Sequence, residues 1–162
     1  MAEDVDIDDQ LTLRHQVCFT LAVASREVVS LYRPLLQPLG LTHPQYLVMV
    51  TLWSVGEPIS IKELSRLLKL EAPTLSPLLK RLQSAGLVER QRDPADERSL
   101  LVSLTQQGLD LRVQAASVPA ALFGRLGMSA EKIETLRDVL TELIDHAQDQ
   151  DGPDRDSGAV GT

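Results

Sequence analysis

The sequence predicts a mainly α-helical fold with one small β-hairpin. Leucine, valine, alanine and isoleucine recur at helical spacing through most of the 162 residues, and hydrophobic residues make up 43% of the chain, enough for the core of one domain. Two short segments of β-type composition flank a polar stretch past the middle. The sequence has no apolar run of membrane-spanning length and no secretory signal in its acidic start. We therefore expect a cytoplasmic protein that binds no membrane.

The N-terminal part is expected to hold a flexible acidic segment at 1–9 and a long helix at 10–36. Gly40 stops that helix, because glycine readily adopts the left-handed conformation found after helix ends. A second helix is predicted from just after Thr42 to about Ser54, with a proline in its first turn.

A pair of short helices follows. Ser60 caps a helix predicted at 61–68, and a second one at 72–85 ends at Gly86. Pro77 falls near the first turn of the second helix, where it removes one backbone donor. Two helices joined by such a short turn are typical of a DNA-binding helix-turn-helix.

A β-hairpin is predicted directly after the helix pair. Its strands are expected at 87–92 and 99–104, and the polar loop 93–98 with its turn-forming proline joins them. The helix pair and the hairpin together indicate a winged helix-turn-helix lobe at 37–104.

The C-terminal part is predicted to be helical as far as residue 148. Helices are expected from Thr105 to about Val118, at 120–126, and from Ser129 onward, whereas the tail 149–162 is expected to be disordered. The long helices in 10–36 and 105–148 carry more apolar surface than one small lobe can cover. We therefore expect them to form a homodimer.

The charge of the chain is unevenly distributed. The whole chain has a net charge of −7, whereas residues 61–104 contain eight Lys and Arg against six Asp and Glu, a net charge of +2. Phosphate attraction acts over about 10 Å at moderate salt. A locally basic module on an acidic body can therefore bind double-stranded DNA.

Cys18 is the one cysteine of the chain. A single cysteine excludes an internal disulfide framework and a zinc site made of several cysteines. It leaves three interpretations, which are an inert buried thiol, an intermolecular link and a reactive thiol. No metal site and no cofactor are predicted.

Five segments carry recognisable motifs, which are 16–19, 41–49, 74–82, 85–88 and 93–99. They resemble the MarR family, with a match from about residue 11 to 146. The Asp96-x-Arg98 pattern in the hairpin is highly specific for the family in this context, and the segment around Cys18 resembles its organic-hydroperoxide repressor branch.

The resemblance implies a set of DNA-contacting residues. In this family the second helix of the pair enters the major groove, and the arginine of the wing reaches the minor groove, where an aspartate orients it. A solvated helix face remains the alternative interpretation of Lys80 and Arg81. The implied residues are Thr74, Ser76, Lys80, Arg81, Arg90, Arg92, Asp96 and Arg98.

The resemblance also implies a redox-sensing site. A thiolate at Cys18 would attack the hydroperoxide and become a sulfenic acid, which requires hydrogen-bond donors near the sulfur. Tyr32 lies 14 residues further along the same helix, about 21 Å away along its axis. It therefore cannot touch the Cys18 of its own chain if the helix is straight. A dimer two-fold axis can bring Tyr32 to the Cys18 of the other subunit, and the resemblance implies this arrangement.

Two further residues complete the predicted sensing site. His43 occupies the position of a second sensing tyrosine of the family and can donate a hydrogen bond to a thiolate. Tyr46 belongs to the matching motif, with a core aromatic as the alternative interpretation. The chain has no second cysteine, so the sulfenic acid is expected to form a mixed disulfide with a small cellular thiol or to be overoxidised. Either product would release a repressor from a pseudo-palindromic operator.

Two other functions remain open. One is a repressor of the same family that responds to a small aromatic or lipophilic ligand, with Cys18 passive. The other is a thiol peroxidase, which would leave the helix-turn-helix unexplained and lacks a resolving cysteine. We therefore predict a regulator and not an enzyme.

Overall fold

The computed structural model describes residues 16–150. The chain divides into two compact units, of which the first ends at Leu122 and the second begins at Phe123. The predicted acidic segment, the predicted start of the first helix at residue 10 and the tail from residue 151 onward lie outside the described residues.

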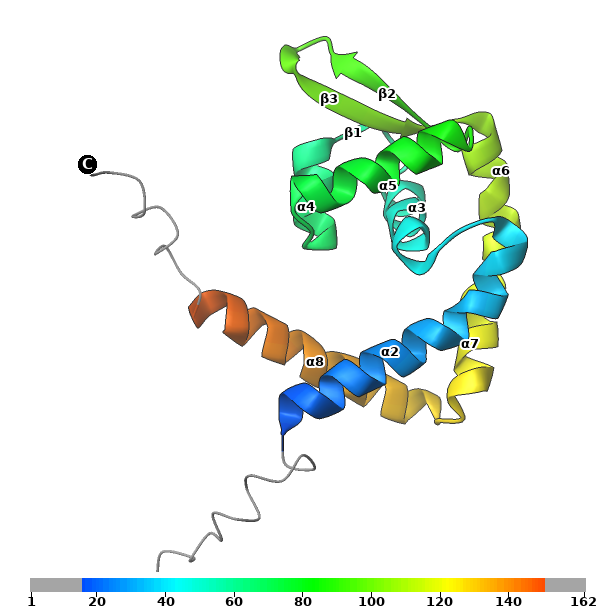
Figure 1. Cartoon of the computed structure of the whole chain (residues 1–162), viewed down its shortest axis with the longest axis vertical. Helices are drawn as coiled ribbons and strands as arrows, with labels where there is room; N and C mark the ends of the chain where they lie inside the picture. The colour runs from blue at the N-terminus through cyan, green and yellow to red at the C-terminus, as the bar shows by residue number, and fades with distance from the viewer. Residues whose placement is uncertain (1–15, 151–162) are drawn as a thin grey trace, which may run out of the picture. The chain divides into compact units, whose positions relative to one another are not determined.

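The described residues form a mainly α-helical fold with a small antiparallel sheet in the order β1-β3-β2 (Figure 1), which confirms the predicted fold class. The helix α7 continues from the first unit into the second, and α8 lies wholly in the second. The elements are α2 (Val17–Leu36), the 3-10 helix η2 (Gln37–Leu39), α3 (His43–Val55), β1 (Ile59–Ser60), α4 (Ile61–Leu68), α5 (Ala72–Ser84), β2 (Val88–Asp93), β3 (Asp96–Leu104), α6 (Gln106–Ala115), α7 (Val118–Leu126) and α8 (Ala130–Gln150).

The predicted helix boundaries agree with the structure to within a few residues because local caps define them. The Ser60 hydroxyl accepts a hydrogen bond of 3.1 Å from the backbone N–H of Glu63 at the start of α4. The Thr105 hydroxyl accepts one of 3.0 Å from Gly108 at the start of α6. Gly40 follows η2 with a φ of +67°, the left-handed conformation that its glycine predicts.

The sheet differs from the prediction in two places. The prediction of a polar loop over 93–98 is wrong, because only Pro94 and Ala95 form the turn and Asp96 already pairs with Asp93. The Asp93 carboxylate accepts a hydrogen bond from the Ala95 N–H at 2.8 Å and closes this tight turn. The strand β1 was not predicted, since its two residues carry no local signal and it forms only by pairing with β3.

The hydrophobic core lies between α3, α4, α5 and the sheet. Leu75, Leu79 and Leu82 of α5 are fully buried at the i, i+4, i+7 spacing of one helix face. The opposite face of α5 is left exposed. Other fully buried core side chains are Leu36, Val48, Met49, Leu52, Leu64, Val88 and Val102.

A buried joint connects α3, α6 and the base of the hairpin. The Trp53 indole N–H donates a hydrogen bond of 2.8 Å to the backbone carbonyl of Gly108. The Thr105 hydroxyl donates to the carbonyl of Gly86 at 2.5 Å, and the Thr105 N–H donates to Leu87 at 3.1 Å. The end of α5, both ends of the hairpin and the start of α6 therefore meet at one place.

Replacing Trp53 with phenylalanine is expected to lower the free energy of unfolding by about 1–2 kcal/mol, because a buried carbonyl loses its side-chain donor while most of the ring volume remains. Trp53 is the one tryptophan of the chain, so the variant has no tryptophan fluorescence and urea unfolding is followed by circular dichroism. An unchanged unfolding midpoint would show that the hydrogen bond contributes no net stability.

Candidate functional site

The exposed face of α5 carries the predicted DNA-contacting residues of that helix. Thr74, Ser76, Lys80 and Arg81 are all exposed, opposite the buried leucines. The side chains of Lys80 and Arg81 form no hydrogen bond or ion pair with any other described residue. This face therefore offers two short hydroxyls for base edges or phosphates and two unpaired cations.

The hairpin positions four more of the predicted residues, and two of its arginines are already engaged. The Arg90 Nε donates to the Gln83 side-chain oxygen at 2.6 Å and thereby ties β2 to α5. The Arg92 guanidinium donates to the backbone carbonyl of Glu97 at 3.0 Å. These arginines hold the hairpin together as well as adding positive charge to its surface.

Arg98 projects from the exposed part of β3 and has no side-chain partner among the described residues. We expected the Asp96 carboxylate to bind the Arg98 guanidinium. Instead it accepts a hydrogen bond of 3.1 Å from the Arg98 backbone N–H, because the tight turn places these two backbones together. Asp96 therefore shapes the backbone that carries Arg98, and the guanidinium is left available.

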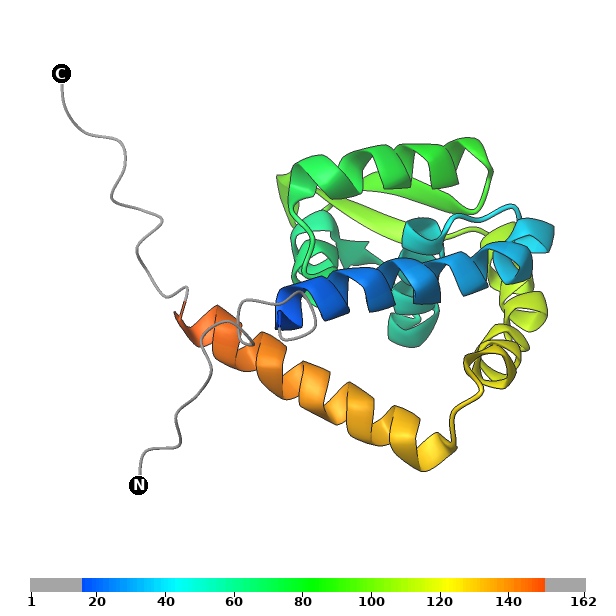
Figure 2. The same cartoon turned by 60° about the horizontal axis from the view of Figure 1, so that its bottom comes forward.

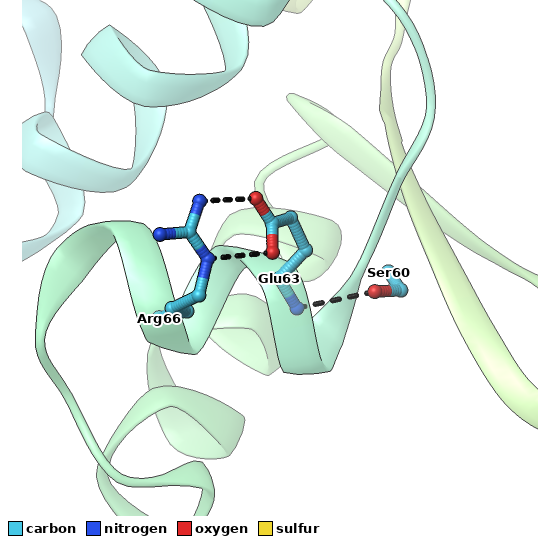
Figure 3. A network of polar contacts seen from close by, with 3 residues as sticks. All are labelled: Ser60, Glu63 and Arg66. Atoms are coloured by element: carbon cyan, nitrogen blue, oxygen red, sulfur yellow. Dashed lines mark hydrogen bonds and ion pairs between the residues drawn. The ribbon is translucent and has the colours of Figure 1, made fainter.

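The structure also adds polar contacts that the sequence analysis missed. In Figure 3 the Arg66 guanidinium faces the Glu63 carboxylate, with N–O distances of 2.8 and 2.6 Å, next to the cap of Ser60. The hydrogen bond from Arg66 lowers the pKa of the Glu63 carboxyl. The i, i+3 spacing signals this pair, whereas the Gln83–Arg90 contact spans a helix and a strand and has no such local signal.

Three predicted sensing residues come together where α2 lies beside α3 (Figure 2). The ring centroids of Tyr32 and His43 are 4.6 Å apart, and those of Tyr32 and Tyr46 are 5.8 Å apart. Tyr32 and His43 are half-buried and Tyr46 is buried. We call these three residues the aromatic cluster.

The polar atoms of the aromatic cluster form no hydrogen bond with any described residue. Burial lowers the pKa of His43, so the neutral ring is favoured near pH 7. Burial also raises the pKa of Tyr32 and of Tyr46, and the neighbouring Tyr32 adds to the shift of Tyr46. The cluster therefore presents neutral donors that can bind an anionic sulfur.

The half-buried position of His43 predicts a pH dependence of stability. Its pKa in the folded protein lies below the ordinary value of 6.5, so the unfolded chain binds the proton more readily, and stability falls as the pH drops below that value. We expect the free energy of unfolding to fall more in the wild type than in His43→Gln between about pH 7.5 and about pH 5.5. Urea unfolding at both pH values measures this, and equal losses would contradict it.

Cys18 lies apart from the aromatic cluster of its own chain. It is exposed in the first turn of α2, and α2 continues as one helix to Leu36 (Figure 2). The 14 residues between Cys18 and Tyr32 therefore span about 21 Å. Contact between the thiol and this aromatic cluster requires a second copy of the chain.

Comparisons with known proteins identify the family of this chain. The sequence pattern of the MarR family matches residues 41–100. The organic hydroperoxide resistance transcriptional regulator of Bacillus subtilis (strain 168) is 39% identical over 137 residues, which cover 85% of this chain and 92% of that protein. The structure of reduced AbfR bound to DNA matches this chain with a TM-score of 0.70 and 31% sequence identity, and the match covers 86% of this chain and 97% of AbfR. The structure of overoxidised AbfR bound to DNA matches with a TM-score of 0.66 and 34% sequence identity, and the match covers 84% of this chain and 98% of AbfR.

The family match includes both helices of the pair and most of the hairpin. The similarity to the Bacillus regulator extends over most of both chains. No described helix has the length and apolar character needed to cross a bilayer. This chain belongs to the MarR family of transcriptional regulators, which are not enzymes.

Proposed function

We propose that this regulator is a cytoplasmic homodimeric repressor that releases its operator when an organic hydroperoxide oxidises Cys18. The observation that carries the proposal is the aromatic cluster, whose unpaired donors are out of reach of the Cys18 of the same chain. Tyr32 lies about 21 Å further along α2, and His43 and Tyr46 of α3 pack against it. The similarity to the Bacillus organic hydroperoxide resistance transcriptional regulator supports an organic hydroperoxide as the signal.

Exposed apolar side chains support the dimer. In the second unit, Leu136, Val139, Leu143 and Ile144 of α8 are between 43% and 57% exposed and follow the spacing of one helix face. In the first unit, Val17 and Phe19 flank Cys18 and are 64% and 45% exposed. A second copy would cover these residues and bring its aromatic cluster to the thiol.

The sensing reaction is a two-electron oxidation of sulfur. The Cys18 thiolate attacks the terminal oxygen of the hydroperoxide, the S–O bond forms and the O–O bond breaks. The alkoxide leaves, takes up a proton and becomes the alcohol, while the sulfur becomes a sulfenic acid. Tyr32 and His43 of the second copy donate hydrogen bonds that stabilise the thiolate. A small cellular thiol then condenses with the sulfenic acid to a mixed disulfide and releases water.

Operator binding uses the two symmetry-related lobes. The exposed face of α5 enters the major groove, with Thr74, Ser76, Lys80 and Arg81 at its surface, and Arg98 enters the adjacent minor groove. The two lobes must match half-sites about one helical turn apart. Added bulk at the dimer interface changes this spacing and releases the DNA.

The test is binding of the reduced protein to a palindromic fragment from its own upstream region. We expect cumene hydroperoxide in the presence of glutathione to abolish binding and dithiothreitol to restore it, whereas Cys18→Ser stays bound throughout. Overoxidised AbfR has been solved bound to DNA, so mass spectrometry identifies the oxidised form in each sample. A wild-type protein that remains bound as its mixed disulfide would contradict the proposal.

A second candidate signal is a small lipophilic or aromatic ligand. A pocket of about 320 Å³ lies between α3 and the helices α6 and α7 and is lined by Tyr46, Val50, Trp53, Arg112 and Pro119 among others, within the size range of small-molecule sites. The Cys18→Ser variant separates the two signals, because it abolishes the response to hydroperoxide and retains the response to a ligand.

A further inference from the structure

We propose that a pocket beside the aromatic cluster binds the carboxylate of an amphipathic organic hydroperoxide through Arg26 and Arg33. The inference rests on the proposed function and adds to it two residues that select and position the oxidant. The oxidant that they select is a hydroperoxide on an apolar chain that also carries a carboxylate.

The pocket lies within the first unit, between α2 and the segment that leads into α3. Its volume is about 810 Å³, enough for a small amphipathic molecule. Leu36 and Leu41 form buried parts of its wall, and Val29 and Pro44 add exposed apolar surface. The walls therefore suit an apolar chain.

The charges of the pocket select an anion. Arg26 and Arg33 are seven residues apart and thus on one face of α2, about 10 Å apart along its axis. Neither guanidinium forms a hydrogen bond or ion pair with a described residue. None of the residues that line the pocket is acidic, although the whole chain carries −7. Two unpaired guanidiniums above an apolar wall match a carboxylate on an apolar chain.

His43 connects the pocket to the sensing chemistry. It lines the pocket and also packs against Tyr32 in the aromatic cluster. In the proposed dimer, the Cys18 of the second copy meets this cluster. A hydroperoxide held by its carboxylate at Arg26 or Arg33 would therefore lie with its apolar chain beside the site where the thiolate attacks.

Binding of the carboxylate by the arginines leaves the oxidation reaction itself unchanged. The thiolate of the second copy takes the terminal oxygen, the O–O bond breaks, and the hydroxy acid leaves after its alkoxide takes up a proton. The arginines act by raising the local concentration and fixing the orientation of the oxidant. They affect only oxidants that carry a negative charge.

The experiment compares the hydroperoxide of linoleic acid with its methyl ester, which differs by the loss of the charge. Oxidation of the single thiol is measured by thiol titration against time, at oxidant concentrations below micelle formation. We expect the acid to oxidise the wild type about tenfold faster than the ester, the usual order for a charge-assisted contact. In Arg26→Ala/Arg33→Ala this rate ratio is expected to fall to about one.

Charge-retaining and competition experiments serve as controls. The Arg26→Lys/Arg33→Lys variant keeps the positive charges, and its ratio of acid to ester oxidation rates is expected to stay well above that of the alanine variant. Unoxidised linoleic acid is expected to slow oxidation by the acid hydroperoxide in the wild type. High salt is expected to lower the wild-type ratio, because exposed charges are screened.

The outcomes separate the two proposals. Equal rates for acid and ester in the wild type, or the same ratio in the wild type and the alanine variant, would overturn the carboxylate site and leave the redox repressor intact. If neither oxidant reacts with Cys18, the proposed function fails and the carboxylate site fails with it.

Discussion

Replacing Arg98 with alanine is expected to weaken binding of the reduced protein to its operator by about 100-fold. Arg98 is exposed near the tip of the hairpin, and its guanidinium has no partner among the described residues. A contact of this kind contributes about 1–3 kcal/mol, and the proposed dimer makes it twice. A factor of about ten for each copy therefore multiplies to about 100. Fluorescence anisotropy with labelled operator at one fixed salt concentration measures the affinity.

Two controls test whether the loss comes from the minor groove. Arg98→Lys keeps the positive charge and is expected to recover part of the affinity, since lysine neutralises a phosphate but fits a narrow groove less well. Replacing A·T pairs beneath the hairpin with G·C is expected to weaken operator binding by the wild type much more than it weakens operator binding by the Arg98→Ala variant. Equal weakening of both proteins would place Arg98 away from those base pairs.

Replacing Gly108 with alanine is expected to lower the free energy of unfolding by about 3 kcal/mol, the upper range for overpacking of a well-filled site. A Cβ atom at this position would overlap the carbonyl oxygen of Leu87 and lie 3.1 Å from its carbonyl carbon. That carbonyl is held in place by the Thr105 N–H at 3.1 Å, and the Gly108 carbonyl is held by Trp53. The backbone of the buried joint must therefore shift to admit one methyl group.

Gly124→Ala is the matched control. It adds the same methyl group to the helix α7, where nothing lies within 4 Å of the new Cβ, so it is expected to stabilise the protein by about 0.5–1 kcal/mol. Urea unfolding of both variants at one protein concentration compares them with the wild type. Equal stability of Gly108→Ala and the wild type would show that the joint tolerates expansion.

The candidate site was partly accessible from the sequence. Family motifs pointed to Cys18, His43 and Tyr46. Helix geometry separated Cys18 from Tyr32 by about 21 Å, and the resemblance implied a role for Tyr32 across a dimer. The 4.6 Å packing of Tyr32 against His43 was not predictable, because it depends on how α2 folds back onto α3 through the turn at Gly40. The pocket with Arg26 and Arg33 depends on the same turn and also went unpredicted.

The helix pair, the hairpin and most element boundaries could be predicted from residue patterns. Periodicity and caps such as Ser60 and Thr105 act within about four residues, so they are readable without a structure. Three contacts follow only from the tertiary structure. They are the hydrogen bond from Trp53 to Gly108, 55 residues away, the hydrogen bond from Arg90 to Gln83 and the pairing of β1 with β3. Such contacts depend on which surfaces the whole chain buries together, and local residue patterns carry no information about that choice.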